Sequence, residues 1–170
     1  MSKEQAVKKH HISWTQLEGY CVDLVLQMVK DNWKPDIIVG ITRGGAIPAV
    51  MISHMLDVKM VGLDVSLYDS DIGPESNCWL AEDALAGRKI LIVDDINDRG
   101  NTINWIKKDW EASVAGTKKS IEWGFSTRIA VVVDNESSKA EITPQYCGVT
   151  VNKADEDVWL VFPYEEFWKK

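Results

Sequence analysis

Residues 89–102, with the sequence KILIVDDINDRGNT, combine a short apolar run with an acidic turn. The run over residues 89–93 has the composition of a strand that is buried on both faces, as in a parallel sheet. Three aspartates follow within five residues, and a helix is predicted over residues 102–110. The notable residues of the turn are Asp94, Asp95, Asp98, Gly100 and Asn101. Because ligands of open α/β sheets bind beyond the carboxyl ends of the strands, this turn is a candidate binding site.

The residue types in this turn suit a phosphorylated sugar. The free backbone N–H groups and the positive dipole end of the helix favour a phosphate. Three close carboxylates repel one another, so they usually need a cation or hydroxyl donors as partners. The structural alternative is an acidic strand end in which Asp98 only caps the following helix.

A second turn of similar character follows the apolar run over residues 36–41. It reads Thr42-Arg43-Gly44-Gly45, with one cation and two glycines that allow a ligand to approach the backbone closely. Such a motif is weak alone and is common in solvated turns. Two turns suited to anions, on neighbouring strands, are much less expected by chance.

The remaining chain alternates between predicted helices and strands, which favours an α/β fold around a mostly parallel sheet. Helices are predicted over residues 15–28 and 47–56, and strands over residues 59–65, 128–133, 149–151 and 158–162. Thr15 to Glu18 have the spacing of a capping box. Residues 66–87 are polar and predict a long loop, of the kind that often serves as a lid.

Composition limits the class of protein. A chain of 170 residues fits a single domain over residues 1–170. Its net charge of −7 argues against nucleic-acid binding, which needs a basic face. No apolar stretch approaches the length of a membrane span. The three cysteines are odd in number and lack metal-ligand spacing, which predicts reduced thiols and a cytoplasmic location.

Four stretches resemble the type I phosphoribosyltransferases, in order, over residues 12–165. ILIVDDINDRGNT resembles the ribose-5-phosphate fingerprint of that family, and VGITRGGAIPA resembles its pyrophosphate loop. ISWTQL near the start and DVWLVFPYE near the end resemble the bacterial xanthine-guanine branch. The resemblance implies a twisted, mostly parallel sheet flanked by helices, with a small hood built from terminal segments that include residues 152–170. It also implies that residues 66–87 form a flexible catalytic lid.

The resemblance also implies how phosphoribosyl pyrophosphate (PRPP) is bound. The ribose phosphate would contact Asp94, Asp95, Asp98, Arg99, Gly100, Asn101 and Thr102. Asp94 and Asp95 would face the ribose hydroxyls and coordinate Mg²⁺, with Asp95 as the main ligand. The pyrophosphate would contact Thr42, Arg43 and Gly44, and relatives often have a cis peptide where this chain has Thr42-Arg43. The catalytic residues implied are Asp98, Asp95 and Arg43.

For the acceptor base, the resemblance implies three contacts. Trp159 would stack on a purine, main-chain groups of Leu160 would bind its edge, and Asn135 would meet its 6-oxo group. Without the resemblance, Trp159 could equally be a strand residue that covers the core.

The sequence departs from the family pattern at four places. Arg99 replaces a threonine, and could pair with a phosphate or point into solvent. Asn135 replaces the lysine that binds the 6-oxo group. Residues 66–87 contain no Lys or Arg to meet pyrophosphate, and residues 117–126 form an insertion of unexplained role.

The expected function is therefore a Mg²⁺-dependent purine phosphoribosyltransferase of purine salvage. It would use PRPP and hypoxanthine, guanine or xanthine, and release pyrophosphate and the nucleoside 5′-monophosphate. A weakly active or inactive regulatory protein that binds PRPP or nucleotides is the alternative, and another acceptor base is a third possibility. Eight tryptophans in so short a chain favour a homodimer or homotetramer, because aromatic residues are enriched at interfaces.

Overall fold

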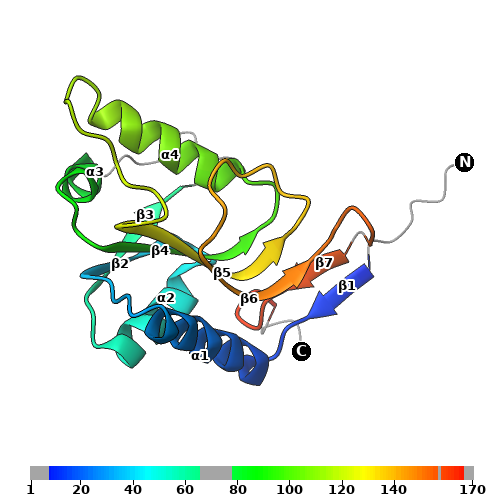
Figure 1. Cartoon of the computed structure of the whole chain (residues 1–170). Helices are drawn as coiled ribbons and strands as arrows, with labels where there is room; N and C mark the ends of the chain where they lie inside the picture. Colours follow the sequence, from blue (N-terminus) through cyan, green and yellow to red (C-terminus); the bar gives the residue numbers. More distant parts are fainter. Residues whose placement is uncertain (1–7, 66–77, 157, 167–170) are drawn as a thin grey trace, which may run out of the picture.

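A five-stranded parallel sheet forms the centre of the protein (Figure 1). The computed structural model describes residues 8–65, 78–156 and 158–166. Along the sheet the strands are β3 (Met60–Asp64), β2 (Ile37–Thr42), β4 (Ile90–Asn97), β5 (Thr127–Asn135) and β6 (Tyr146–Val151). All four pairings between neighbouring strands are parallel. The predicted α/β class with a mostly parallel sheet is confirmed.

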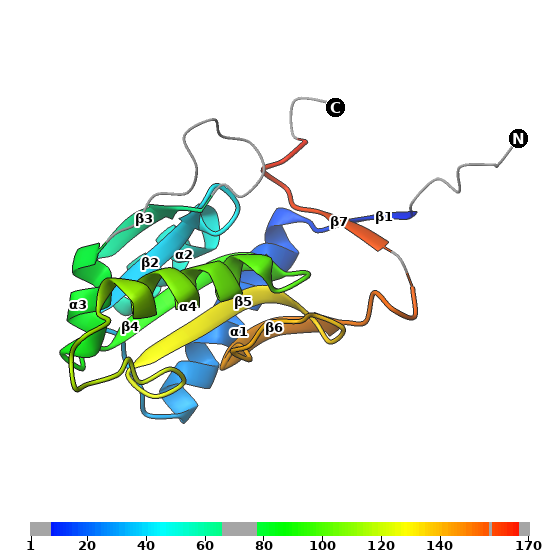
Figure 2. The ribbon, with the colours of Figure 1, turned by 90° about the horizontal axis from the view of Figure 1, so that it is seen from above.

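Helices cover both faces of this sheet (Figures 1 and 2). One face packs against α1 (Trp14–Lys30) and α2 (Ala46–Leu56), and the other against α3 (Cys78–Leu85) and α4 (Asn101–Ser113). Strand β4 supplies both cores, because successive side chains point to opposite faces. Ile90 and Ile92 lie in the core beneath α3 and α4, whereas Leu91 and Val93 lie in the other core. This explains the continuous apolar run of β4.

A second, two-stranded sheet lies beyond the carboxyl ends of the central strands (Figure 1). It pairs β1 (Lys8–His11) with β7 (Val158–Val161) in parallel register. Its strands come from opposite ends of the chain, so this small sheet is the hood that was expected from terminal segments.

Two of the element boundaries that differ from the sequence prediction concern α1 and β4. Helix α1 begins at Trp14 because the capping box is formed by Ser13 and Gln16, two residues before the predicted one at Thr15. Strand β4 continues to Asn97, so Asp94 and Asp95 belong to the strand and not to the turn after it.

The predicted loop over residues 66–87 is wrong in its second half. Residues 66–77 lie outside the described residues, but α3 occupies Cys78–Leu85. This helix buries Leu80, Ala81 and Ala84 against the sheet. The acidic Glu82 and Asp83 interrupt that apolar pattern in the sequence, and Asp83 pairs with Arg88 at 2.7 Å.

The insertion over residues 117–126 packs back against α4. Ile121 is buried, and the Trp123 ring stacks on that of Trp110 with ring centroids 5.8 Å apart. The Trp123 indole N–H also donates to Glu111. The insertion therefore extends the core on this face.

Among the described residues, no helix is long and apolar enough to cross a membrane.

Candidate active site

The turns after β2 and β4 lie against each other, because these strands are neighbours in the sheet. A Cβ atom at Gly44 would lie 2.0 Å from Oδ2 of Asp95, and one at Gly45 would lie 2.3 Å from the carbonyl oxygen of Val93. Only glycine fits so close an approach. Gly44 therefore brings the backbone of the first turn against the Asp95 carboxylate on β4, and Gly45 brings it against the main chain of the same strand.

A cavity of about 300 Å³ opens between the two turns. The predicted site residues that line it are Thr42, Gly44, Asp94, Asp95, Asp98, Arg99, Gly100, Asn101 and Thr102. The Thr42-Arg43 peptide bond is cis, as the resemblance implied. Arg43 is exposed and does not line this cavity.

The loop that follows β4 presents a helix N-terminus to this cavity. Gly100 is the N-cap of α4 with a φ of 87°, and no side chain caps the helix. The first N–H groups of a helix have no partner within the helix, which favours an anion at this end, and the helix dipole adds to the attraction. Asn101 and Thr102, in this first turn, both line the cavity.

Asp94 and Asp95 place two carboxylates at one wall of the cavity. Burial raises the pKa of Asp94 well above its usual range, and the neighbouring Asp95 charge adds to this rise. Burial also raises the pKa of Asp95, although hydrogen bonds from Asp94 and from the Ile96 N–H oppose it. A cation or hydroxyl donors would relieve the repulsion between the two groups.

This donor set fits Mg²⁺. Magnesium prefers oxygen ligands and is usually held by one or two carboxylates together with substrate oxygens and water. Within the described ranges, no three His, Cys, Asp or Glu side chains are grouped to hold a metal by themselves. Asp94 and Asp95 would therefore hold the ion jointly with a phosphate-bearing substrate.

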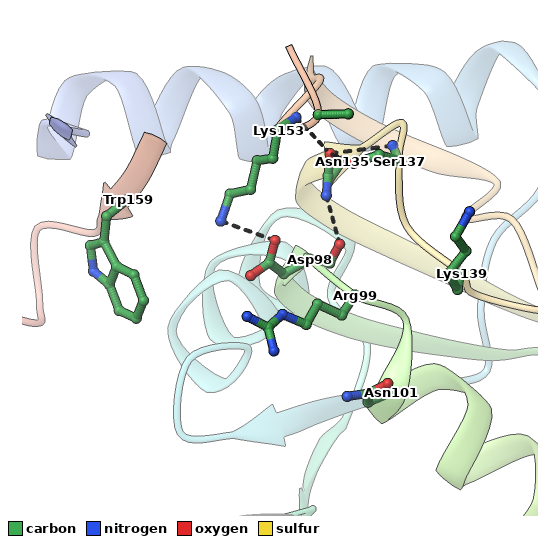
Figure 3. A pocket seen from close by; sticks show the side chains of 9 residues that line it. Asp98, Arg99, Asn101, Asn135, Ser137, Lys139, Lys153 and Trp159 are labelled. Atoms are coloured by element: carbon green, nitrogen blue, oxygen red, sulfur yellow. Dashed lines mark hydrogen bonds and ion pairs between the residues drawn. The ribbon is translucent and has the colours of Figure 1, made fainter. Parts of the chain in front are cut away.

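A second cavity, of about 460 Å³, meets the first at Asp98, Arg99 and Asn101. It is also lined by Asn135, Ser137, Lys139, Lys153, Ala154 and Trp159 (Figure 3). Trp159 is 58% exposed, so it does not cover the core, which was the structural alternative for this residue. Arg99 borders both cavities.

Leu160 lies next to Trp159 on β7 but does not line this second cavity. The carbonyl of Val161 faces β1, where it accepts a hydrogen bond from the Ile12 N–H. Because backbone groups alternate along a strand, those of Leu160 point away from β1, to the other edge of β7. Its predicted main-chain contact with a base would use that edge.

Asn135 lies at the cavity wall, but its amide is engaged with the protein. Its Nδ2 donates to the carbonyl of Asp98 at 2.8 Å, and its Oδ1 accepts from the N–H groups of Ser137 and Lys153. A direct contact between Asn135 and a base stays a prediction. Lys153, which sequence reasoning missed, places its Nζ 3.0 Å from Oδ1 of Asp98.

Tyr164 is a second residue that sequence reasoning missed. Its hydroxyl donates to the carbonyl of Gly44 at 2.9 Å and lies 3.5 Å from Oδ2 of Asp95. Burial raises the pKa of Tyr164, so the hydroxyl keeps its proton and remains a donor. Its ring stacks on Phe162 with ring centroids 5.6 Å apart. The C-terminal segment is thereby tied to the turn after β2 and to β4.

Comparison with known proteins identifies the family. A model of the phosphoribosyl transferase domain matches residues 6–166. The chain belongs to the phosphoribosyltransferase family. The resemblance seen in the sequence is thereby confirmed.

Relatives of this phosphoribosyltransferase are named for purine bases. Xanthine phosphoribosyltransferase 1 of Saccharomyces cerevisiae is 25% identical, over 93% of this chain and 90% of its own length. Xanthine-guanine phosphoribosyltransferase of Roseobacter denitrificans is 27% identical, over 96% and 92%. These names agree with the purine branch indicated by the sequence motifs.

Two solved structures share the fold over almost the whole chain. A purine phosphoribosyltransferase from Pyrococcus horikoshii superposes with a TM-score of 0.65 at 24% identity, covering 95% of this chain and 96% of its own. A Neisseria gonorrhoeae protein solved with bound ppGpp superposes with a TM-score of 0.71 at 22% identity, covering 95% and 92%.

Replacing Asp94 by asparagine should stabilise this phosphoribosyltransferase in the absence of ligands. Because burial raises the pKa of Asp94 in the folded state, ionisation costs stability as the pH rises above the unfolded value of 3.8. We expect Asp94→Asn to raise the free energy of unfolding at pH 7.5. At pH 4 the gain should shrink, because the Asp94 carboxyl is then partly protonated in the unfolded chain as well. Urea unfolding at both pH values measures the difference, and an equal gain at both would contradict the argument.

Replacing Tyr164 by phenylalanine should weaken the binding of PRPP in the first cavity without unfolding the phosphoribosyltransferase. The ring can still stack on Phe162, but the hydrogen bond to the Gly44 carbonyl is lost. We expect the KM for PRPP to rise about fivefold, the equivalent of one hydrogen bond, while the KM for the base changes little. Steady-state kinetics with each substrate varied in turn measures the split. An unchanged KM for PRPP would show that the hydroxyl does not position the turn.

Proposed function

We propose that the protein transfers ribose 5-phosphate from PRPP to a 6-oxopurine and releases pyrophosphate and the nucleoside 5′-monophosphate. The observation that carries this proposal is the meeting of the two cavities at Asp98. One cavity offers carboxylates and a helix N-terminus, and the other offers an exposed aromatic ring. The purine names of the relatives support the choice of acceptor.

In this proposal PRPP occupies the first cavity. The N–H groups of residues 98–102 bind the 5′-phosphate, and Asp94 and Asp95 accept hydrogen bonds from the ribose hydroxyls. The turn from Thr42 to Gly44 holds the pyrophosphate, with the exposed Arg43 at its outer side. Mg²⁺, held by Asp94 and Asp95, would neutralise charge on the leaving pyrophosphate.

The purine occupies the second cavity in the same proposal. Stacking on Trp159 is worth roughly 1–3 kcal/mol and does not by itself distinguish one purine from another. Nitrogen N9 of the base forms a bond to C1′ of the ribose while the bond from C1′ to the pyrophosphate oxygen breaks. The base loses its ring N–H proton, and the Asp98 carboxylate, at the junction of the cavities, is placed to accept it.

The test is a direct activity panel. The protein is mixed with Mg²⁺, PRPP and one base at a time, with hypoxanthine, guanine, xanthine and adenine as the four arms. Chromatography then measures the nucleoside monophosphate, and a reaction with chelator tests the need for Mg²⁺. Nucleotide from at least one 6-oxopurine supports the proposal, and no nucleotide from any of them overturns it.

Calorimetry with PRPP separates the main proposal from its alternative. Arg99 and the lack of Lys or Arg in residues 66–87 are the departures that favour a regulatory protein without turnover. Binding of PRPP with no product would support that alternative.

The main proposal also includes a homodimer or homotetramer, a cytoplasmic location and a place in purine salvage. Sedimentation velocity measures the number of subunits.

A further inference from the structure

We propose that Lys153 binds the 6-oxo group of the acceptor base and thereby selects 6-oxopurines over adenine. This inference rests on the proposed function, since it names the residue that sets the choice of acceptor. It assigns to the end of β6 the task that the resemblance gave to position 135.

The position of the Lys153 ammonium carries the inference. Lys153 follows β6, and its side chain is only 17% exposed although it is charged. Lysine is rarely buried to this degree unless it is paired. Its partner is Asp98, with 3.0 Å between Nζ and Oδ1, and this pair faces the open cavity with Trp159 on the other side (Figure 3). A base stacked on Trp159 would therefore bring its edge to this pair.

Asn135 positions the Lys153–Asp98 pair and does not itself bind the base. It is 5% exposed, and its amide bonds to the Asp98 carbonyl on one side and to the Lys153 N–H on the other. These two hydrogen bonds fix the backbone of both members of the ion pair. Asn135 is in this view a positioning residue, and Lys153 supplies the donor.

The other two cations of the cavity are less suited to this task. Arg99 is exposed and also lines the first cavity, where the proposal places the sugar phosphate, whereas Lys153 lines only the second. Lys139 is exposed and lies on the side of the cavity away from Trp159 (Figure 3).

The chemistry of the pair matches one edge of a 6-oxopurine. Guanine presents N7 and O6 side by side, whereas adenine presents N7 beside an amino group. An ammonium has three donors and no acceptor, so Lys153 can donate to O6 but has nothing to offer the adenine amino group. Asp98, as its neighbour, can accept a hydrogen bond on the same edge from N7 when the base is in its N7–H form, and this is the ring proton that the proposed transfer removes. With adenine bound, the ammonium would face another donor, which costs binding.

The experiment compares Lys153→Met with Lys153→Arg, which retains a donor. We expect Lys153→Met to lower kcat/KM for guanine and hypoxanthine by about 10- to 100-fold, with little change for adenine. The ratio of kcat/KM for a 6-oxopurine to that for adenine should therefore fall. Lys153→Arg should recover part of the preference. Lys139→Met removes the same charge from the far side of the cavity and should affect all bases alike. An unchanged preference in Lys153→Met overturns the inference.

Nucleotide binding separates this inference from the proposed function. Calorimetry measures the affinity of wild type and both Lys153 variants for GMP and AMP, without any need for turnover. If wild type makes no nucleotide but binds GMP more tightly than AMP, and Lys153→Met loses that difference, the role of Lys153 stands and the proposed activity fails. If wild type is active and Lys153→Met keeps its GMP preference, the activity stands and the inference fails. Thermal unfolding shows that each variant is folded.

Discussion

Replacing Gly100 by alanine should lower the free energy of unfolding by about 2–4 kcal/mol and abolish PRPP binding. Gly100 has a φ of 87°, which costs a residue with a side chain, and the new Cβ would lie 2.2 Å from the backbone nitrogen of Ala140. Because the new Cβ would clash with backbone atoms, which cannot rotate away as a side chain can, the loop after β4 must move. That loop is the proposed phosphate site, so stability and binding should fall together.

Gly116→Ala is the matched control. Gly116 has a similarly positive φ of 95°, but no atom lies within 4 Å of a Cβ placed there. Gly116→Ala should lower the free energy of unfolding by only about 1–2 kcal/mol, the cost of a positive φ for a residue with a side chain, and it should bind PRPP as wild type does. Urea denaturation and calorimetry with PRPP measure both effects. Equal losses of stability in the two variants would show that the contact with Ala140 does not restrain Gly100.

Replacing Asp95 by asparagine should reduce kcat/KM for PRPP by about 100- to 1,000-fold while the protein stays folded. The variant loses the charge that would face Mg²⁺ and the ribose hydroxyls. Its amide oxygen can still accept from the Ile96 N–H, and its amide nitrogen can donate to the Tyr164 hydroxyl nearby. The fold should therefore survive the change.

Asp134→Asn is the control for Asp95→Asn. Asp134 also stands near the end of a central strand, where it accepts from the Asn97 amide, and it lines neither cavity. An asparagine there can still accept that hydrogen bond, so activity should be close to that of wild type. Steady-state kinetics with PRPP varied, and thermal unfolding of each variant, complete the comparison. Full activity or loss of the fold in Asp95→Asn would contradict the role given to this carboxylate.

The sequence predicted best those elements whose pattern of apolar and polar residues lies within one continuous segment. The apolar run before Asp94 predicted a central strand, because β4 supplies side chains to both cores. The turns after β2 and β4 were predicted as neighbours, and the close contact between Gly44 and Asp95 agrees. Helix α3 was missed because acidic residues on its exposed side mask the small apolar residues that it buries.

Residues that meet only through tertiary structure could not be found in this way. Lys153 reaches Asp98 because the end of β6 lies close to the loop after β4. Tyr164 reaches Gly44 because the C-terminal segment folds back over the first turn. No local spacing links these partners in the sequence. The FPYE stretch was a signal for Tyr164, but it did not reveal the contact that its hydroxyl makes.

The pairing of β1 with β7 has a consequence for how this protein can diverge. The strand that presents Trp159 is supported by a segment from the opposite end of the chain, and both lie apart from the five-stranded sheet. Substitutions in β1 can therefore alter the support of the strand that presents Trp159 while the five-stranded sheet is unchanged. For the same reason, a tag fused ahead of β1 is attached to the small sheet that carries Trp159, and a tag-free preparation is the proper reference.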